Sequence, residues 1–481
     1  MTKHARFERV VMKYEVVVNG KTSDVELPFA TGILADFAGT QASPKEIYDR
    51  AFVEVRADTF DACMRAMRPR AIFTVPDTLT GSGELAIDIT FDGMADFAPA
   101  AILRKVEPLR ALAEVRDRSA AEIDRRIARQ LDPILRAEAI RQLERTWRGL
   151  HYLVSHTSTR DVRIRILNIT KRELAHMLRR YRGVGWDQSP LFKKIYDQEY
   201  GTLGGTPFGC LVGDYCFDHG AADVEMLGEI GKVAAASHAL FVAGAASTLF
   251  QAPSWSQWAH RPDLGSTFGS DEYAAWRALR ASDTARHIAL VMPPFQGGDP
   301  GNEAWVNAAY ALAANIHRSF ERNGWFSRTF GPEHGAIEGS PATEAAVDAS
   351  AEAELAAHGL VALALGKYSD AAAFLSANTL HEPAASDEPT VTANARLAAS
   401  VPYVLAVGRL AHYLNAIVRD KYEMVTDRRH VQGELDRWIA DYVDGPGMLG
   451  WRPFASARIV ADRPDGAPRS HGVKFWALPN D

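Results

Sequence analysis

The first hydrophobic pattern along the chain is a run of mostly β-branched residues at 10–18, Val-Val-Met-Lys-Tyr-Glu-Val-Val-Val. The run ends at Asn19-Gly20, and apolar residues resume at Val25. Asn-Gly is a strong signal for a tight hairpin turn, because both residues tolerate a positive φ. The pattern therefore predicts a β-hairpin near the N-terminus.

A second alternating pattern predicts another hairpin, with a first strand at 72–75 and a Gly-Ser-Gly connection at 81–83. Apolar residues then fall on one face of the following strand. These residues are Leu85, Ile87, Ile89 and Phe91. Apolar residues at helical spacing from about 100 to 116 predict one helix after this hairpin. Residues 1–118 are therefore expected to form a small α+β domain.

Residues 119–481 alternate between strand and helix patterns and predict a larger mixed α/β domain. A capping-box sequence at Ser119–Glu122 predicts the start of a helix that stops at Pro133, and a second capping box lies at Thr170–Glu173. The predicted strands are 162–168, 210–215, 239–243, 288–292, 359–364, 455–461 and 473–477. The predicted helices further along are 222–239, 303–322, 371–377, 391–419 and 427–443.

Composition excludes several classes of protein. The 481 residues carry a net charge of −6, without the basic stripe of a nucleic-acid binder. The sequence contains no run of about 18 apolar residues, so it predicts no membrane span, and the start of the chain has no apolar signal region. Three cysteines are too few for a disulfide scaffold and fit a reducing compartment. We therefore expect a cytoplasmic globular protein that binds no nucleic acid and does not insert into a membrane.

Candidate chemistry is sparse. The glycine-rich segment Gly201–Gly209 could cradle a phosphate, but it precedes a strand and lacks a Lys-Ser/Thr pair, so a structural turn is favoured. Cys210, Cys216 and His219 could contribute to a metal site, but their spacing is not that of a zinc site, and small buried side chains are favoured.

The histidines and carboxylates give no clearer signal. His238, His287 and His412 lack a nucleophile motif, and no Gly-x-Ser-x-Gly elbow occurs. Carboxylate pairs such as Asp223/Glu225 or Asp436/Asp441 are more typical of solvated helix faces. The sequence thus predicts no catalytic residue, no cofactor and no metal, although an enzyme that uses residues 201–219 remains an alternative.

Two parts of the chain resemble known families. Residues of about 8–117 resemble the small subunit of the type VI secretion contractile sheath, the TssB or VipA family. The phrases that carry this resemblance include Glu26-Leu-Pro-Phe29, Gly32-Ile-Leu-Ala-Asp36-Phe, Val75-Pro-Asp77 and Phe97-Ala-Pro99.

Residues of about 120–478 resemble the large subunit of the same sheath, the TssC or VipB family. The matching phrases include Trp147-Arg-Gly-Leu-His-Tyr-Leu-Val154, Ser189-Pro-Leu-Phe-Lys-Lys-Ile-Tyr196, Glu199-Tyr-Gly-Thr-Leu-Gly-Gly-Thr-Pro-Phe-Gly209 and Gly213-Asp-Tyr215. The two subunits are usually separate chains in that family, whereas here they are joined near 117–120.

The resemblance implies a structural protein rather than an enzyme. It implies a homopolymer, with separate sheath subunits as possible further partners, that surrounds an inner tube protein, meets baseplate components and contracts to drive injection. The leader of the large subunit, which in some members carries the signal for the recycling ATPase, is replaced here by the small-subunit-like region. We therefore do not expect that ATPase as a partner. A sheath-like capping or regulatory factor that does not polymerise is the alternative.

The resemblance also implies β-strand exchange between neighbouring copies. Open strand edges with unpaired N–H and C=O groups are templates for another chain. We expect the strand at 10–18 and the strand at 473–477 to supply these edges. The residues predicted to contact neighbouring copies are Val10, Met12, Tyr14, Val16, Val473 and Phe475.

Overall fold

The computed structural model describes most of the chain. The described residues are 9–18, 21–40, 45–114, 120–258, 263–297, 304–339, 341–366, 369–384, 386–421, 428–445, 452–462 and 472–480.

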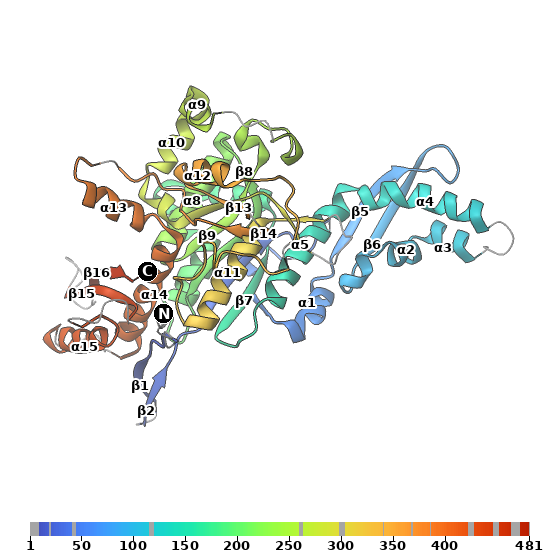
Figure 1. Ribbon diagram of the computed structural model, residues 1–481. Helices are drawn as coiled ribbons and strands as arrows, with labels where there is room; N and C mark the ends of the chain where they lie inside the picture. Colours follow the sequence, from blue (N-terminus) through green and yellow to red (C-terminus); the bar gives the residue numbers. More distant parts are fainter. Residues whose placement is uncertain are drawn as a thin grey trace, which may run out of the picture.

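A mixed sheet of eight strands forms the centre of this described structure (Figure 1). In spatial order the strands are β14 (Ser369–Phe374), β13 (Leu360–Gly366), β10 (Ile288–Met292), β9 (Leu240–Ala245), β8 (Phe208–Phe217), β3 (Phe29–Ala35), β7 (Val162–Asn168) and β4 (Val53–Val55). The inner strands run parallel, and β14 and β4 pair antiparallel at the two edges. The mixed α/β class predicted from the sequence is confirmed.

Strand β3 belongs to the small-subunit-like region but lies in the middle of this sheet. Ile33 is in register with Ile166 of β7 on one side and with Val212 of β8 on the other. All seven residues of β3 are buried. The predicted boundary at 118/119 therefore separates two regions of sequence, and the two regions share one sheet.

Helices cover both faces of the sheet, as a parallel sheet requires. One face packs against α5 (Glu138–Ser155) and α11 (Ala308–Asn323). The other face packs against α6 (Lys171–Arg180), α8 (Ala221–Ala236), α10 (Ala274–Arg280) and α12 (Ala349–Ala357). The capping box at Thr170 is confirmed, because its hydroxyl accepts the Glu173 N–H while the Glu173 carboxylate accepts the Thr170 N–H. Shorter helices are α1 (Phe60–Met67), α7 (Pro190–Phe192) and α9 (Leu264–Gly269).

A separate lobe extends from one end of the sheet (Figure 1). It contains β5 (Arg70–Pro76), β6 (Glu84–Thr90), α2 (Pro99–Lys105), α3 (Glu107–Glu114) and α4 (Ala120–Arg136). The predicted hairpin is confirmed, since Ile87, Ile89 and Phe91 are buried together.

Two helix predictions for this lobe are wrong in detail. The single helix expected at 100–116 breaks at Val106, which is extended; Pro108 follows closely, and its missing N–H removes a helical hydrogen bond there. Pro133 does not stop its helix but lies inside α4, which continues to Arg136. Ser119, the predicted cap of this helix, lies outside the described residues.

Two further predictions fail in the C-terminal half. The helix predicted at 371–377 is wrong, because most of these residues form β14 at the sheet edge. Pairing with β13, in which Leu363 lies opposite Phe374, outweighs the local helix propensity. The helix expected at 391–419 is divided into α13 (Pro389–Ala398) and α14 (Val401–Lys421).

Both described chain ends lie together at the side of the sheet opposite the lobe (Figure 1). The elements there are β1 (Tyr14–Val18), β2 (Lys21–Val25), α14, α15 (Arg428–Ala440), β15 (Phe454–Asp462) and β16 (Gly472–Pro479). Away from the chain ends, β11 (Phe295–Gln296) and β12 (Trp305–Val306) form a short antiparallel pair. The predicted pairing of the N-terminal strands is confirmed, while Asn19-Gly20 lie outside the described residues. The predicted strands 455–461 and 473–477 pair with each other. Residues from these end elements form a third apolar core.

Helix α14 crosses this core. Its stretch Val401–Asp420 has a mean hydropathy of 1.2 and is long enough to cross a membrane, a feature that the sequence analysis did not find. However, 72% of that stretch is buried inside the molecule, so α14 fits the role of a core helix.

The packing of α5 on α11 gives a stability prediction. A Cβ at Gly149 would lie 2.3 Å from Cε2 of buried Tyr310, whereas a Cβ at Gly433 on α15 meets nothing within 4 Å. We expect Gly149→Ala to lower the free energy of unfolding by about 1–3 kcal/mol through overpacking. Gly433→Ala should raise it by up to about 1 kcal/mol through helix propensity. Denaturant unfolding of both variants checks this, and equal effects would contradict it.

Candidate assembly interface at the chain ends

Side chains from α14 and α15 hold the segment that precedes β1. The Tyr413 hydroxyl donates to the Met12 carbonyl at 2.5 Å, and Trp438 Nε1 donates to the Lys13 carbonyl at 2.7 Å. The Lys13 N–H donates to the Tyr442 hydroxyl at 3.0 Å. The Tyr14 hydroxyl donates to Asp420 at 2.8 Å. The start of the N-terminal segment is therefore paired within its own chain.

The six predicted contact residues all turn towards this chain's own third core. Met12 and Tyr14 are buried, and the other four are partly buried against the same core. The exposed side chains are those at the alternate positions. They are Val11, Lys13 and Glu15 at the N-terminal end and Lys474, Trp476 and Leu478 on β16. The prediction that Val10, Met12, Tyr14, Val16, Val473 and Phe475 lie at copy–copy contacts thus stays a prediction.

The β1–β2 hairpin keeps open backbone beyond Lys13. Alternate residues of a strand direct their N–H and C=O to opposite edges. Because Lys13 bonds to α15 on the side away from β2, Glu15 directs its backbone groups to the same outer edge. Asp24, which is opposite Glu15, directs its groups to the outer edge of β2. No partner among the described residues bonds the backbone of Glu15 or Asp24.

The C-terminal hairpin has a similar open edge on β16. The Ala477 carbonyl accepts a hydrogen bond from the Tyr403 hydroxyl at 3.1 Å, which shows that Ala477 faces away from β15. By alternation, Val473 and Phe475 face the same way. Within the described part of the chain, no hydrogen-bond partner reaches the N–H or C=O of Val473 or Phe475. This edge can therefore accept another strand.

Side chains of opposite charge lie on the two hairpins. Glu15 and Asp24 are exposed and directly opposite each other, an arrangement that is unfavourable for like charges. On the other hairpin, Arg458 and Lys474 are exposed on the face that carries Trp476, and the Arg458 guanidinium lies 5.7 Å from the centroid of the Trp476 ring. Trp476 is 57% exposed. The sequence analysis missed Trp476, although its alternation with Phe475 could have placed it outward.

The other candidates from the sequence have structural roles. Gly204 has a φ of +74°, and a Cβ at Gly205 would lie 2.3 Å from the Glu199 carbonyl, so the segment at 201–209 is a tight turn into β8. Cys210 is buried in β8, and burial raises its pKa to about 12. His219 stacks on Tyr273.

The remaining candidate groups are also accounted for by structural contacts. Cys216 lies at an irregularity in β8 and is exposed, so the prediction of a small buried side chain is wrong at this position. Asp223 forms an ion pair with Lys171 at 2.7 Å, and Glu225 forms one with Arg182. Among the described residues, no group of three or more histidine, cysteine, aspartate or glutamate side chains is placed to hold a metal ion.

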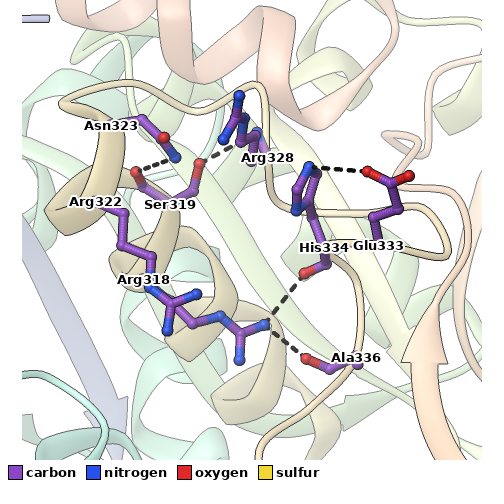
Figure 2. A pocket seen from close by; sticks show the side chains of 8 residues that line it. All are labelled: Arg318, Ser319, Arg322, Asn323, Arg328, Glu333, His334 and Ala336. Carbon is purple, nitrogen blue, oxygen red and sulfur yellow. Dashed lines mark hydrogen bonds and ion pairs between the residues drawn. The ribbon is translucent and has the colours of Figure 1, made fainter. Parts of the chain in front are cut away.

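A cavity of about 280 Å³ lies at the end of α11 and contains three arginines (Figure 2). Arg318 donates to the carbonyls of His334 at 3.2 Å and Ala336 at 2.6 Å. The Ser319 hydroxyl accepts the Arg328 N–H at 3.2 Å. These bonds fasten the loop that follows α11 onto the helix, which gives the polar groups a structural role.

Buried histidines join the two sequence regions. His317 on α11 lies between two threonines. Its Nε2 is 2.7 Å from the hydroxyl of Thr31 on β3, and its Nδ1 is 2.9 Å from the hydroxyl of Thr157, which follows α5. Burial lowers the pKa of His317 to about 3. Burial likewise lowers the pKa of His412 to about 3, of His238 to about 4, and of His287 below its usual range.

These shifts predict acid sensitivity. The unfolded chain binds a proton at His317 near pH 6.5, but the folded chain does so only near pH 3. The stability contribution is therefore fully present above pH 6.5 and is lost as the pH falls below it. His317→Gln should reduce the slope of unfolding free energy against pH, between pH 6 and 4, by about 1.4 kcal/mol per pH unit.

The matched control is His176→Gln, because His176 is exposed on α6. Because this side chain is exposed, the variant controls for the replacement of a histidine by glutamine outside the core. Denaturant titrations at a series of pH values measure both slopes. Identical slopes for the two variants would contradict the prediction.

Comparisons with known proteins identify the class of protein to which this chain belongs. The family model described as "Type VI secretion system, VipA, VC_A0107 or Hcp2" matches residues 2–139. The model "EvpB/VC_A0108, tail sheath N-terminal domain" matches 117–303 and 296–381. The model "EvpB/VC_A0108, tail sheath gpW/gp25-like domain" matches 390–479.

Two proteins of Pseudomonas aeruginosa are similar in sequence. The type VI secretion system sheath protein TssC1 is 41% identical over 405 residues, which are 75% of this chain and 81% of that protein. The sheath protein TssB1 is 48% identical over 112 residues, which are 23% of this chain and 65% of that protein. The chain thus spans slightly less than two thirds of the TssB1 length.

More distant matches among solved structures come from contractile injection systems. The contracted helical sheath of the anti-feeding prophage has a TM-score of 0.43 and 9% identity, with 100% of this chain and 96% of that chain covered. The contracted PVC sheath complex has a TM-score of 0.42 and 11% identity, with 70% of this chain and 77% of that chain covered.

The sequence matches establish that the chain belongs to the type VI secretion sheath family. It joins a TssB-like region and a TssC-like region in one polypeptide and is a structural component of a contractile sheath.

Proposed function

We propose that copies of this chain polymerise by strand addition, in which the β1–β2 hairpin of one copy adds to the open β16 edge of the next. The observation that carries this proposal is the unpaired backbone of Val473 and Phe475. A strand edge at one position and a projecting hairpin at another form a heterologous contact, and such contacts generate helical filaments.

The charges on the two hairpins support this choice of partner. An incoming hairpin that carries Glu15 and Asp24 would meet the face that carries Arg458 and Lys474. Opposite charges at this contact would relieve the repulsion between the two adjacent carboxylates and steer the approach of the two copies. A second copy therefore fits the β16 edge better than an unrelated strand does.

The polymer would act in the cytoplasm as a sheath around an inner tube protein and would meet baseplate components at one end. Its work would come from relaxation of many copy–copy contacts during contraction, and no catalytic step is needed. Family membership supports this role, and the structural use of the candidate groups agrees with it.

Loss of one amide on the open edge tests strand addition. Val473→Pro removes an N–H that faces away from β15, so the pairing of β15 with β16 is kept. We expect the critical concentration for polymer formation to rise roughly fivefold to tenfold, since a lost hydrogen bond costs about 1 kcal/mol net. Val473→Ala also shortens the side chain but keeps the amide, and it should polymerise close to the wild-type concentration.

Sedimentation and negative-stain microscopy measure the polymer, and circular dichroism confirms that both variants fold. A critical concentration for Val473→Pro equal to that of the wild-type chain would overturn the proposal. A wild-type chain that stays monomeric but binds the ends of a sheath would favour the capping alternative.

Charge reversal on the β1–β2 hairpin tests whether this hairpin is the partner of the β16 edge. Glu15→Lys together with Asp24→Lys would replace attraction to Arg458 by repulsion and should raise the critical concentration. The control is Glu84→Lys, an exposed glutamate on β6 in the lobe at the other end of the molecule. The difference between the two variants should shrink as salt increases, because salt screens exposed charges. Equal critical concentrations at low salt would contradict the prediction.

A further inference from the structure

The β15–β16 hairpin has two edges, and they differ. In an isolated two-stranded sheet, both outer edges present unpaired N–H and C=O groups and invite another strand. The β16 edge is open at Val473 and Phe475. The β15 edge is instead bonded to side chains and backbone of the same copy.

One side chain on α15 bonds to the β15 edge as a neighbouring strand would. Gln432 Nε2 donates to the Ile459 carbonyl at 2.9 Å, and Gln432 Oε1 accepts the Ala461 N–H at 2.8 Å. A carbonyl and the N–H two residues later are the pair of groups that one residue of a parallel strand would bond. The amide of Gln432 thus occupies the place of an incoming peptide group.

The orientation of this amide is fixed by its own helix. Gln432 Nε2 also donates to Asp436 Oδ1, one turn further along α15, at 2.8 Å. Both donors of the amide therefore have acceptors, and its oxygen accepts from Ala461. An Asn or Gln side chain whose groups are all bonded is held in one orientation.

Other bonds close both ends of the β15 edge, so that among the described residues only the Ile459 N–H and the backbone of Ala457 lack a bonded partner on this side. Arg428 Nε donates to the Ala461 carbonyl at 2.7 Å. At the other end of the strand, the Phe454 N–H donates to the Tyr442 carbonyl at 3.1 Å, and the Asp444 N–H donates to the Phe454 carbonyl at 2.9 Å. The chain that leaves α15 thus forms a short parallel bridge with β15.

We infer that Gln432 is an edge guard that makes strand addition to the C-terminal hairpin one-sided. Another copy adds at β16 and is excluded from β15, so each copy accepts a single incoming hairpin and the polymer does not branch. Asp436 is a positioning residue for this guard. The inference rests on the proposed strand addition and names the residue that gives it direction.

The inference is tested by removing the Gln432 side chain in the Val473→Pro variant, in which the β16 edge has lost an amide. At a concentration between the wild-type critical concentration and the raised one, Val473→Pro alone is expected to be monomeric. Adding Gln432→Ala would open the β15 edge and restore self-association, which sedimentation would detect as a shift from monomer to larger, irregular species. In the same double variant, hydrogen exchange at the Ala461 amide should quicken about tenfold or more, because its acceptor is gone.

Two matched variants separate an open edge from general destabilisation. Arg437→Ala changes an exposed side chain on the same helix, and Gly149→Ala destabilises the core far from this edge. Combined with Val473→Pro, both should stay monomeric. Gln432→Ala in the otherwise unchanged chain should give branched or bundled polymers instead of single tubes.

The outcomes distinguish the two proposals. If Val473→Pro alone polymerises at the wild-type critical concentration, strand addition at β16 is wrong. If Val473→Pro is monomeric and Val473→Pro with Gln432→Ala is equally monomeric, strand addition stands and the role of Gln432 is overturned. Self-association of the Gly149→Ala or Arg437→Ala combinations to the same extent would also overturn it.

Discussion

The pairing of β3 with β7 and β8 is the interaction on which the rest of the structure depends. A parallel sheet needs both faces covered and its inner strands apolar, and β3 meets both conditions with every side chain buried. Because β2 leads directly into β3, the position of β3 also places the β1–β2 hairpin beside α14. The end of the molecule that carries both hairpins is thus set by a strand at its centre.

The edges of the two terminal hairpins show how one chain can keep one strand edge open and bond the edges near it. An exposed edge risks indiscriminate pairing, so proteins usually cover or charge their edges. Here the backbone of Lys13 is bonded by Trp438 and Tyr442, and the β15 edge is bonded by Gln432, while the β16 edge is left open. An edge is useful for ordered assembly only when the competing edges nearby are closed.

Much of the fold could be predicted from local patterns. Asn19-Gly20 gave the first hairpin, and the alternation at 85–91 gave the buried face of the second. Alanine-rich β14 was missed because its strand form depends on pairing with β13, which no local pattern shows. The inward turn of Met12 and Tyr14 was missed for a similar reason, since their alternation fixes which residues share a face but not which face meets α14.

The assembly site needed contacts between elements far apart in sequence. In the sequence, Gln432 is an ordinary residue of a helix surface. Only the structure shows that its amide forms hydrogen bonds with the backbone of Ile459 and Ala461. A side chain that replaces a strand has no sequence signature, because its partner groups are backbone atoms that every residue carries. Polar helix residues that face a strand edge are therefore worth attention in any polymer-forming chain.

Joining the two sequence regions in one chain divides the contacts of the sheath into two kinds. The pairing of β3 with β7 and β8 is intramolecular, so its stability does not depend on protein concentration, whereas contacts between copies follow mass action. Dilution should therefore release whole folded copies rather than separated halves. The concentration dependence of assembly should therefore measure the contacts between copies and not the pairing within the sheet. A weak contact between copies becomes effective because it is repeated along the polymer.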